Sequence, residues 1–308
     1  MDNSFYRNLN KERDTRRWLD WDVHRGQIVL LINKAISSQQ DVEEALIIGA
    51  GNCDDLDLIF LSRIFSKIIL MDIDTESLQK GICRLDINLQ KQFQLLGGTD
   101  LSKLDQIDFY KQFIELLENK STASKLGLFM KVISEEIINI EILDEWKGQF
   151  STVISSAVYT QIFYIHVLSL FWPYANNYSP EEISDIVEQV RQLRDQIIRS
   201  YNDLIMSLAK PGGTVIVWTD ALRIDVENPF PEDEFYLLKT EEERVEYLFK
   251  MTEAQGRDVA ILGLKDLHDK ISSQGRHLSS WIWPFSNDKH YITFGLSGWK
   301  FVVESNEK

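Results

Sequence analysis

The fold is decided by residues 45–74, which read ALIIGAGNCDDLDLIFLSRIFSKIILMDID. An apolar run, Ala45–Ile48, meets a Gly-Ala-Gly turn, and a segment with helical periodicity then leads to a second apolar run that ends on Asp72. The order of strand, tight turn, helix, strand and acid is typical of the first βαβ unit of a nucleotide-binding α/β sheet. Gly49 and Gly51 allow a sharp turn and leave room for a ligand against the backbone. Asp72 follows about 20 positions later, where such units place a carboxylate for ribose hydroxyls.

The residues after the turn argue against a dinucleotide. A dinucleotide fingerprint needs Gly-x-Gly-x-x-Gly or Ala, so that a pyrophosphate can meet the helix N-terminus. The last position of that pattern is Asp54 here, and Asp55 and Asp57 follow it. These carboxylates suit the dipole of a helix start, but they repel a pyrophosphate placed there. A cationic cofactor without phosphate groups, such as S-adenosylmethionine (SAM), fits this acidic turn better.

Several stretches of the chain, taken in order, resemble the motifs of class I SAM-dependent methyltransferases. They are IIGAGNCDD at 47–55, ILMDID at 69–74, GGTD at 97–100, and FSTVISSAVYTQ at 150–161 with LAKPGGTVIVW at 208–218. The chain departs from the family at Cys53, which stands where the family has its third motif glycine, in the pocket for the methionine end. The resemblance implies an α/β fold: a Rossmann-like three-layer sandwich with a mostly parallel seven-stranded sheet and a C-terminal antiparallel strand pair.

The same resemblance implies where SAM binds. The expected cofactor-binding residues are Gly49, Ala50, Gly51, Asn52, Asp72, Ile73, Asp100, Leu101 and Ser155. In the family an acid after the third strand reads the adenine amine, and Asp100 matches it by position; a turn aspartate or a helix N-cap is the alternative. Ser155 ends the fourth predicted strand, where it or Ser156 could instead cap the next helix.

The sequence leaves the catalytic base open. Methyl transfer from a sulfonium needs the donor and acceptor to be aligned, and an acceptor hydroxyl or ammonium also needs a base. The candidates are Tyr159, His166, His24 and the acids of residues 220–240. A histidine on an apolar face is also explained as a core residue, which is the alternative for His166. The two cysteines and five histidines show no metal-ligand spacing, so no metal site is predicted.

The chain is predicted to consist of an N-terminal helical segment and one large domain. Residues 1–44 predict helices that either cap the site or only cover the edge of the sheet. Residues 45–308 are expected to form the SAM-binding domain. The connection at about 101–147 is too long for a simple loop, so we expect a helical insertion there.

Further elements follow from capping and turn signals. A Ser-Pro-Glu-Glu sequence at 179–182 predicts a long helix that reaches Lys210. The remaining predictions are helices at 75–88, 162–172, 241–254 and 263–272, a fifth strand at 214–219, an irregular acidic loop at 220–240, and final strands at 277–285 and 290–303.

The composition indicates which acceptors and which cellular compartment to expect. The net charge of −15, from 48 acids against 33 bases, argues against a nucleic-acid acceptor, because phosphate binding needs a basic face. Two cysteines provide no disulfide framework, which fits a reducing cytosol. The charged Met1–Asp20 does not resemble a signal peptide. The apolar stretch Ala157–Trp172 is too short and polar to span a bilayer. We therefore expect a cytoplasmic protein without a membrane span.

The function expected from these features is SAM-dependent transfer of a methyl group to a small-molecule or peptide acceptor. One alternative is a transferase that moves an aminoalkyl group from SAM, as nicotianamine synthase-like enzymes do. Another is a non-catalytic relative that keeps the fold and binds a partner protein. A nicotinamide-dependent oxidoreductase fits least, because Asp54 opposes a pyrophosphate. Neither the acceptor nor the oligomeric state follows from the sequence.

Overall fold

The computed structural model of the chain describes residues 17–37, 39 and 42–301. Its centre is a seven-stranded sheet in the order β3-β2-β1-β4-β5-β7-β6. The first five strands pair in parallel, whereas β7 runs antiparallel to both β5 and β6. This arrangement confirms the predicted fold class. The strands are β1 (Glu44–Ile48), β2 (Lys67–Asp72), β3 (Phe93–Gly97), β4 (Phe150–Ser156), β5 (Ala209–Ile224), β6 (His277–Ser286) and β7 (Lys289–Trp299).

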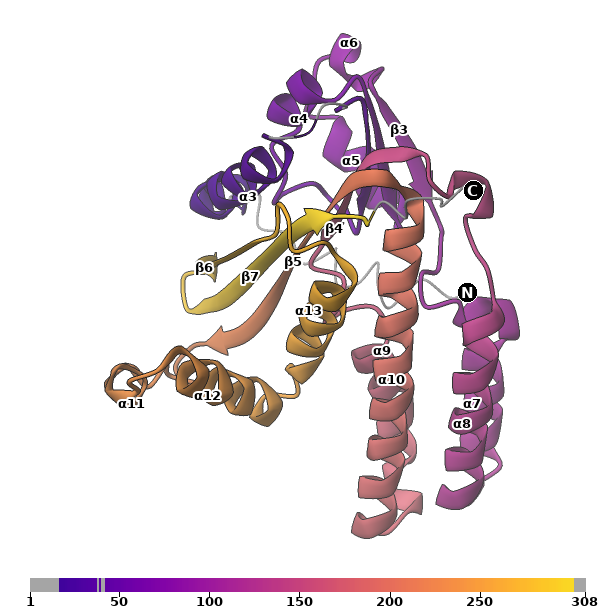
Figure 1. Cartoon of the computed structure of the whole chain (residues 1–308). Coiled ribbons are helices and arrows are strands. Elements are labelled where there is room, and N and C mark those ends of the chain that lie inside the picture. The colour runs from indigo at the N-terminus through magenta and orange to yellow at the C-terminus, as the bar shows by residue number, and fades with distance from the viewer. Residues whose placement is uncertain (1–16, 38, 40–41, 302–308) are drawn as a thin grey trace, which may run out of the picture.

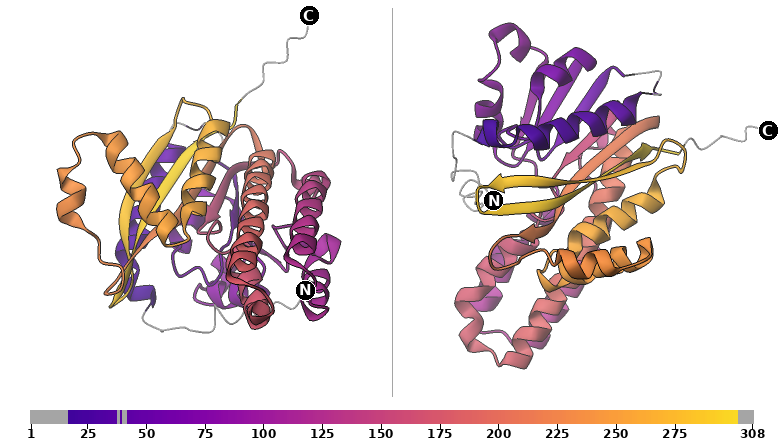
Figure 2. Two further views of the ribbon diagram at one scale, coloured as in Figure 1. Left: turned by 90° about the horizontal axis from the view of Figure 1, so that it is seen from below. Right: turned by 90° about the vertical axis from the view of Figure 1, so that its left-hand side faces the viewer.

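Helices cover both faces of the sheet, which gives three layers (Figures 1 and 2). The side chains of β1 alternate between the faces: Leu46 and Ile48 belong to one apolar core, and Ala45 and Ile47 belong to the other. A parallel strand buried on both sides in this way reads as a continuous apolar run. The first core packs against α7 (Phe109–Glu118), α8 (Ala123–Asn139), α9 (Tyr164–Phe171), α10 (Pro180–Leu208) and α13 (Asp258–Lys270), and the second packs against α3 (Asp22–Ile36), α4 (Leu58–Ile64) and α5 (Thr75–Ile82).

The longest helix, α10, begins with the capping box predicted from its sequence. Ser179 Oγ accepts a hydrogen bond from the Glu182 N–H at 3.2 Å, and a Glu182 carboxylate oxygen accepts one from the Ser179 N–H at 2.9 Å. The helix ends at Leu208 rather than at Lys210, because Ala209 already pairs with Phe150 of β4.

The segment between β3 and β4 contains two one-turn helices, η1 (Leu104–Ile107) and η2 (Asp144–Trp146), with α7 and α8 between them. Together with the first part of α10, α7 and α8 extend well beyond the sheet (Figure 1). The division of the chain at residue 45 and the naming of this segment as an insertion stay predictions. The outer ends of the predicted domains, 1–16 and 302–308, lie outside the described residues.

Two predicted elements near the sheet were wrong in extent. The helix expected at 75–88 ends at Ile82, and a short helix, α6 (Ile87–Gln90), starts after Asp86, whose carboxylate caps it. The loop expected at 220–240 is largely ordered structure. β5 continues through a bulge after Asp220 to Ile224, because its residues find partners along β7, and α11 (Glu232–Leu237) follows.

Smaller boundary differences concern the remaining helices and the last strand. The helix expected at 162–172 is shorter and passes into a 3-10 segment, η3 (Trp172–Asn177). The helix α12 (Glu241–Ala254) matches its prediction and carries the Thr240 capping box, whereas α13 starts five residues earlier than expected, at Asp258. β7 ends at Trp299, and the end predicted for this strand, residue 303, lies outside the described residues. Among the described residues, no helix has both the length and the apolar character needed to cross a bilayer.

Candidate cofactor and acceptor site

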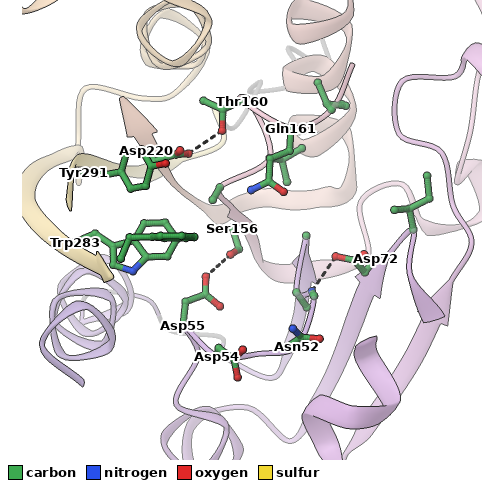
Figure 3. A pocket seen from close by; sticks show the side chains of 18 of the residues that line it. Asn52, Asp54, Asp55, Asp72, Ser156, Thr160, Gln161, Asp220, Trp283 and Tyr291 are labelled. Atoms are coloured by element: carbon green, nitrogen blue, oxygen red, sulfur yellow. Dashed lines mark hydrogen bonds between the residues drawn. The ribbon is translucent and has the colours of Figure 1, made fainter. Parts of the chain in front are cut away.

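A cavity of about 370 Å³ lies at the carboxyl ends of the parallel strands (Figure 3). This is the edge where open α/β sheets bind their ligands. Its lining falls into two parts. We call the first the cofactor half, made of Gly49, Ala50, Gly51, Asn52, Asp54, Asp55, Asp72, Ile73, Thr99, Asp100 and Leu101. We call the second the acceptor half, made of Arg17, Trp21, Ser156, Ala157, Val158, Thr160, Gln161, Ile162, Ile165, Asp220, Arg257, Trp283, Phe285 and Tyr291.

The turn after β1 has the backbone geometry that its glycines predicted. Gly49 and Gly51 adopt positive φ values of 73° and 48°. A Cβ atom on Gly49 would lie only 2.7 Å from the Ser156 carbonyl oxygen, so this glycine lets the turn pack against β4. Among the described residues, a Cβ atom on Gly51 would come within 4 Å only of a carboxylate oxygen of Asp72, at 3.9 Å. The first glycine therefore serves the fold, and the second keeps the cavity open beside Asp72.

Cys53 holds the backbone conformation that a glycine would adopt easily. Its φ is 56°, and its side chain is fully buried. Gly81 of α5 makes room for it, because a Cβ atom on Gly81 would lie 2.9 Å from both Cys53 Sγ and the Asn52 carbonyl oxygen. The departure from the family pattern at Cys53 thus leaves the shape of the turn intact. The role of Gly81 could not be predicted from the sequence, because it depends on a contact between two separate elements.

The carboxylate of Asp72 lines the cavity in a fixed orientation. One oxygen accepts a hydrogen bond from the Gly51 N–H at 2.8 Å, and the other accepts one from the Asp74 N–H at 2.9 Å. Burial raises the pKa of Asp72, and these backbone donors oppose that change. Because each oxygen keeps a further lone pair, the side chain can still accept hydrogen bonds from a ligand.

The loop after β3 brings Thr99, Asp100 and Leu101 to the cavity. Both oxygens of Asp100 are bonded within this loop. One accepts from the Ser102 N–H at 2.9 Å and the Ser102 hydroxyl at 2.6 Å, and the other accepts from the Asp105 N–H at 2.9 Å. These contacts are those of a turn aspartate, the alternative that the sequence left open. A contact between Asp100 and adenine stays a prediction.

Three further residues expected around the cofactor, Ala50, Asn52 and Ile73, also line the cavity. Asn52 is 9% exposed, and its carbonyl Oδ1 has no hydrogen-bond partner among the described residues. Buried polar atoms are normally paired, so an unpaired acceptor in a cavity wall is suited to a donor on a ligand.

Ser155 is the one expected cofactor-binding residue that the structure does not bring to the cavity. Its hydroxyl is buried on the opposite side of β4, 2.6 Å from the hydroxyl of Tyr201 in α10. Ser156 lines the cavity in its place and donates to Asp55 at 2.6 Å. Successive residues of a strand point to opposite faces, which explains the exchange. Neither serine caps α9, whose N-cap is Phe163.

None of the three candidate bases faces the cavity. The Tyr159 hydroxyl donates to Asn202 Oδ1 at 2.7 Å inside the core, and burial raises its pKa well above the ordinary value. His166 is buried in α9, with its ring stacked on Tyr110 at 4.7 Å. His24 is buried behind the cavity wall, where desolvation lowers its pKa to about 3. The structure thus does not bring these three residues to the cavity, and a role for any of them as a base stays a prediction.

The acceptor half has an aromatic wall made of Trp21, Trp283, Phe285 and Tyr291, and His24 supports this wall from behind. Its ring stacks on Trp283 at 4.1 Å with an interplanar angle of 6°, and its Nδ1 accepts from Trp281 Nε1 at 2.8 Å. Trp21 contacts Trp283 edge-on at 4.7 Å and donates to the Phe285 carbonyl at 3.0 Å. The wall thus joins the N-terminal helices to the last hairpin.

Polar groups line the cavity beside this wall. Thr160 Oγ1 donates to one oxygen of Asp220 at 2.7 Å, and Arg257 forms an ion pair with the other. The Arg257 guanidinium lies over the Tyr291 ring, 4.6 Å from its centroid. Figure 3 shows Asp220, Gln161, Trp283 and Asp55 arranged around one space. The sequence pointed to the acids of residues 220–240, which include Asp220, but Arg257 was not expected, because no local signal marks that residue.

Two neighbouring acids of the turn have different surroundings. Asp54 forms an ion pair with Arg84 at 2.8 Å, and its backbone carbonyl accepts from Arg25 at 3.0 Å. Asp55 is buried, and its carboxylate accepts a hydrogen bond from the neutral hydroxyl of Ser156. Desolvation raises the pKa of Asp55 from 3.8 to about 6. The described residues contain no group of three or more side chains suited to hold a metal ion.

We expect Asp55→Asn to stabilise the protein against urea at pH 7.5, with a much smaller gain at pH 4.5. Because the pKa of Asp55 is raised on folding, the folded state binds more protons than the unfolded state between pH 3.8 and about 6. Its contribution to stability therefore falls as the pH rises through this window and stays lower above it. The shift corresponds to roughly 3 kcal/mol at pH 7.5. Equal gains at both pH values in urea unfolding curves would contradict the argument.

The comparisons with known proteins concern the fold. No family model matches the chain, and no curated protein matches its sequence. Among solved structures, the chain is similar to the N-methyltransferase NodS from Bradyrhizobium japonicum WM9 in complex with S-adenosyl-L-homocysteine. The identity is 10%, the match covers 95% of this chain and 96% of that chain, and the TM-score is 0.45. It is also similar to a SAM-dependent methyltransferase from Aquifex aeolicus, with 10% identity, coverage of 97% and 99%, and a TM-score of 0.39.

The order and direction of the strands identify the fold. A parallel sheet ordered β3-β2-β1-β4-β5, extended by β7 and β6 with β7 antiparallel, differs from the dinucleotide-binding sheet, whose sixth strand is parallel. The glycine turn and Asp72 lie at the carboxyl ends of its first two strands. The chain has the class I SAM-dependent methyltransferase fold.

Proposed function

We propose that the protein is a SAM-dependent methyltransferase that acts on a small-molecule or peptide acceptor. The observation that carries this proposal is the cofactor half of the cavity, where the Gly51 N–H holds the Asp72 carboxylate and the missing side chain of Gly51 leaves space beside it. Asp72 would accept hydrogen bonds from the ribose hydroxyls. Asn52 Oδ1, which has no partner among the described residues, would accept one from the amino-acid end.

The rest of the lining fits the same ligand. Ile73 and Leu101 provide apolar contacts for a flat base, and Thr99 and Asp100 lie beside them. Among the described residues beside the turn, Arg84 is paired with Asp54 and is therefore not free to bind a pyrophosphate. A cationic sulfonium is stabilised near Asp55, which favours SAM over a dinucleotide.

When bound, SAM supplies a methyl group on a sulfonium, which an acceptor atom attacks in line. The protein would contribute chiefly by orientation, since a well-placed pair of reactants gains several kcal/mol relative to free reactants. The turn and Asp72 would hold the donor, and the aromatic wall with Thr160, Gln161 and Asp220 would hold the acceptor. The net charge of −15 supports a small molecule or a peptide over a nucleic acid.

The proposal is tested by calorimetric titration of the purified protein with SAM, with NADH as the control ligand. We expect micromolar binding of SAM and no heat from NADH, because the acidic turn excludes a pyrophosphate. Absence of SAM binding would contradict the proposal and leave the non-catalytic alternative. The product formed from SAM separates the two transferase readings: S-adenosylhomocysteine indicates methyl transfer, and methylthioadenosine indicates aminoalkyl transfer.

A further inference from the structure

The acceptor half of the cavity has an aromatic wall whose shape is fixed by its own contacts. Trp283 lies at its centre and is only 5% exposed, with His24 stacked behind it and Trp21, Phe285 and Tyr291 packed around it. His24 is neutral at physiological pH, since its pKa is lowered to about 3. The wall therefore presents electron-rich rings, and the neutral imidazole stacked behind Trp283 adds no positive charge of its own.

These rings already attract cations within the protein. The Arg17 guanidinium lies 5.2 Å from the Phe285 centroid, Lys289 Nζ lies 5.8 Å from the same ring, and Arg257 lies over Tyr291. Aromatic faces bind cations through their quadrupole, and the attraction grows where water is excluded. The wall thus suits a positively charged group better than a negatively charged one.

The charges around the cavity favour the same sign. Arg257 is matched by Asp220, and Arg84 is matched by Asp54. The hydrogen bonds described above for Asp55, Asp72 and Asp100 come from backbone N–H groups and hydroxyls, and no ion pair joins these carboxylates to another described residue. Even with Arg17 counted in full, an anion in this cavity would meet an excess of negative charge.

We propose that the methyl acceptor is an amine, held as a cation between the aromatic wall centred on Trp283 and the carboxylate of Asp55. This inference rests on the proposed function and names the substrate class for the same site. Asp55 lies where the two halves of the cavity meet, because it follows the glycine turn in the chain and accepts its hydrogen bond from Ser156. An amine bound there is adjacent to the expected position of the sulfonium.

Methyl transfer to an amine accounts for every bond, proton and electron pair as follows. The bound ammonium releases one proton to solvent, and the neutral nitrogen donates its lone pair to the methyl carbon. The bond from that carbon to sulfur breaks, its electron pair stays on sulfur, and the sulfonium becomes a neutral thioether. The methylated nitrogen carries the positive charge and remains suited to the same rings until it is released.

The test measures the binding of three probes to the full-length protein saturated with S-adenosylhomocysteine. All three probes share a benzyl group and differ in charge. They are benzyltrimethylammonium, benzyl alcohol and phenylacetate, and the first cannot itself be methylated. We expect the cation to bind at least tenfold more tightly than the other two. Phenylacetate or benzyl alcohol binding as tightly as the cation, or no binding by any probe, would overturn the amine proposal.

Two variants test whether the carboxylate of Asp55 is responsible for binding the cation. Asp55→Asn keeps an acceptor for Ser156 and removes the charge, so it should weaken binding of benzyltrimethylammonium at least fivefold. Glu118→Gln makes the same charge change on an exposed position of α7 and should leave the affinity unchanged. Equal affinities of the two variants would remove Asp55 from the proposal. Binding of S-adenosylhomocysteine is measured first: its failure contradicts the proposed function, whereas its success with no preference for the cation contradicts only the acceptor class.

Discussion

Asp72→Ala is expected to weaken SAM binding by ten- to a hundredfold while the fold persists. Backbone donors from Gly51 and Asp74 orient both oxygens of this carboxylate, and a Cβ on the neighbouring Gly51 would meet little, so space is left beside it. Hydrogen bonds to a charged group contribute about 1.5–3 kcal/mol each, which corresponds to the expected loss. Calorimetric titration of the variant with SAM measures it directly.

The matched control is Asp86→Ala. Asp86 also accepts hydrogen bonds from two backbone N–H groups, those of Asn88 and Leu89, but it caps α6 outside the cavity. We expect this control to lose a similar, small amount of stability and to bind SAM normally. Unchanged SAM affinity in Asp72→Ala, with Asp86→Ala also unchanged, would remove Asp72 from the site.

The two glycines of the turn should separate folding from binding. Gly49→Ala is expected to destabilise the protein by about 2–4 kcal/mol, because a left-handed φ strains a side chain and because the new Cβ would clash with β4. That Cβ would lie 2.7 Å from the Ser156 carbonyl oxygen and 2.6 Å from Val158 Cγ2. Urea unfolding measures the loss.

Gly51→Val should affect SAM binding more than stability, the reverse of Gly49→Ala. Its Cβ would lie 3.9 Å from an Asp72 carboxylate oxygen and within 4 Å of no other atom of the described residues. The Cβ therefore clashes with nothing there, and its cost to the fold is the strain of the left-handed backbone. The added methyl groups would instead fill the space proposed for the cofactor. We expect SAM binding to be lost while the chain still unfolds cooperatively. Normal SAM binding by this variant would show that the ligand does not lie against the turn.

Much of this protein was determined by local sequence. The first βαβ unit, its glycine turn and the position of Asp72 depend on residues that lie within 30 positions of one another. The capping boxes at Ser179 and Thr240 were equally readable, because each needs only four consecutive residues. Where backbone conformation and short-range hydrogen bonds decide the structure, the sequence alone is sufficient.

The acceptor half was decided by tertiary structure. His24 is placed by Trp281 and Trp283, more than 250 residues along the chain, and their packing turns a candidate base into a neutral support. Ser155 and Ser156 exchanged roles because a single step along β4 moves a side chain from one face of the sheet to the other. β5 reached Asp220 in extended form because β7 offered it partners. Contacts between distant segments carry no signature in local sequence, so only the folded chain assigns them.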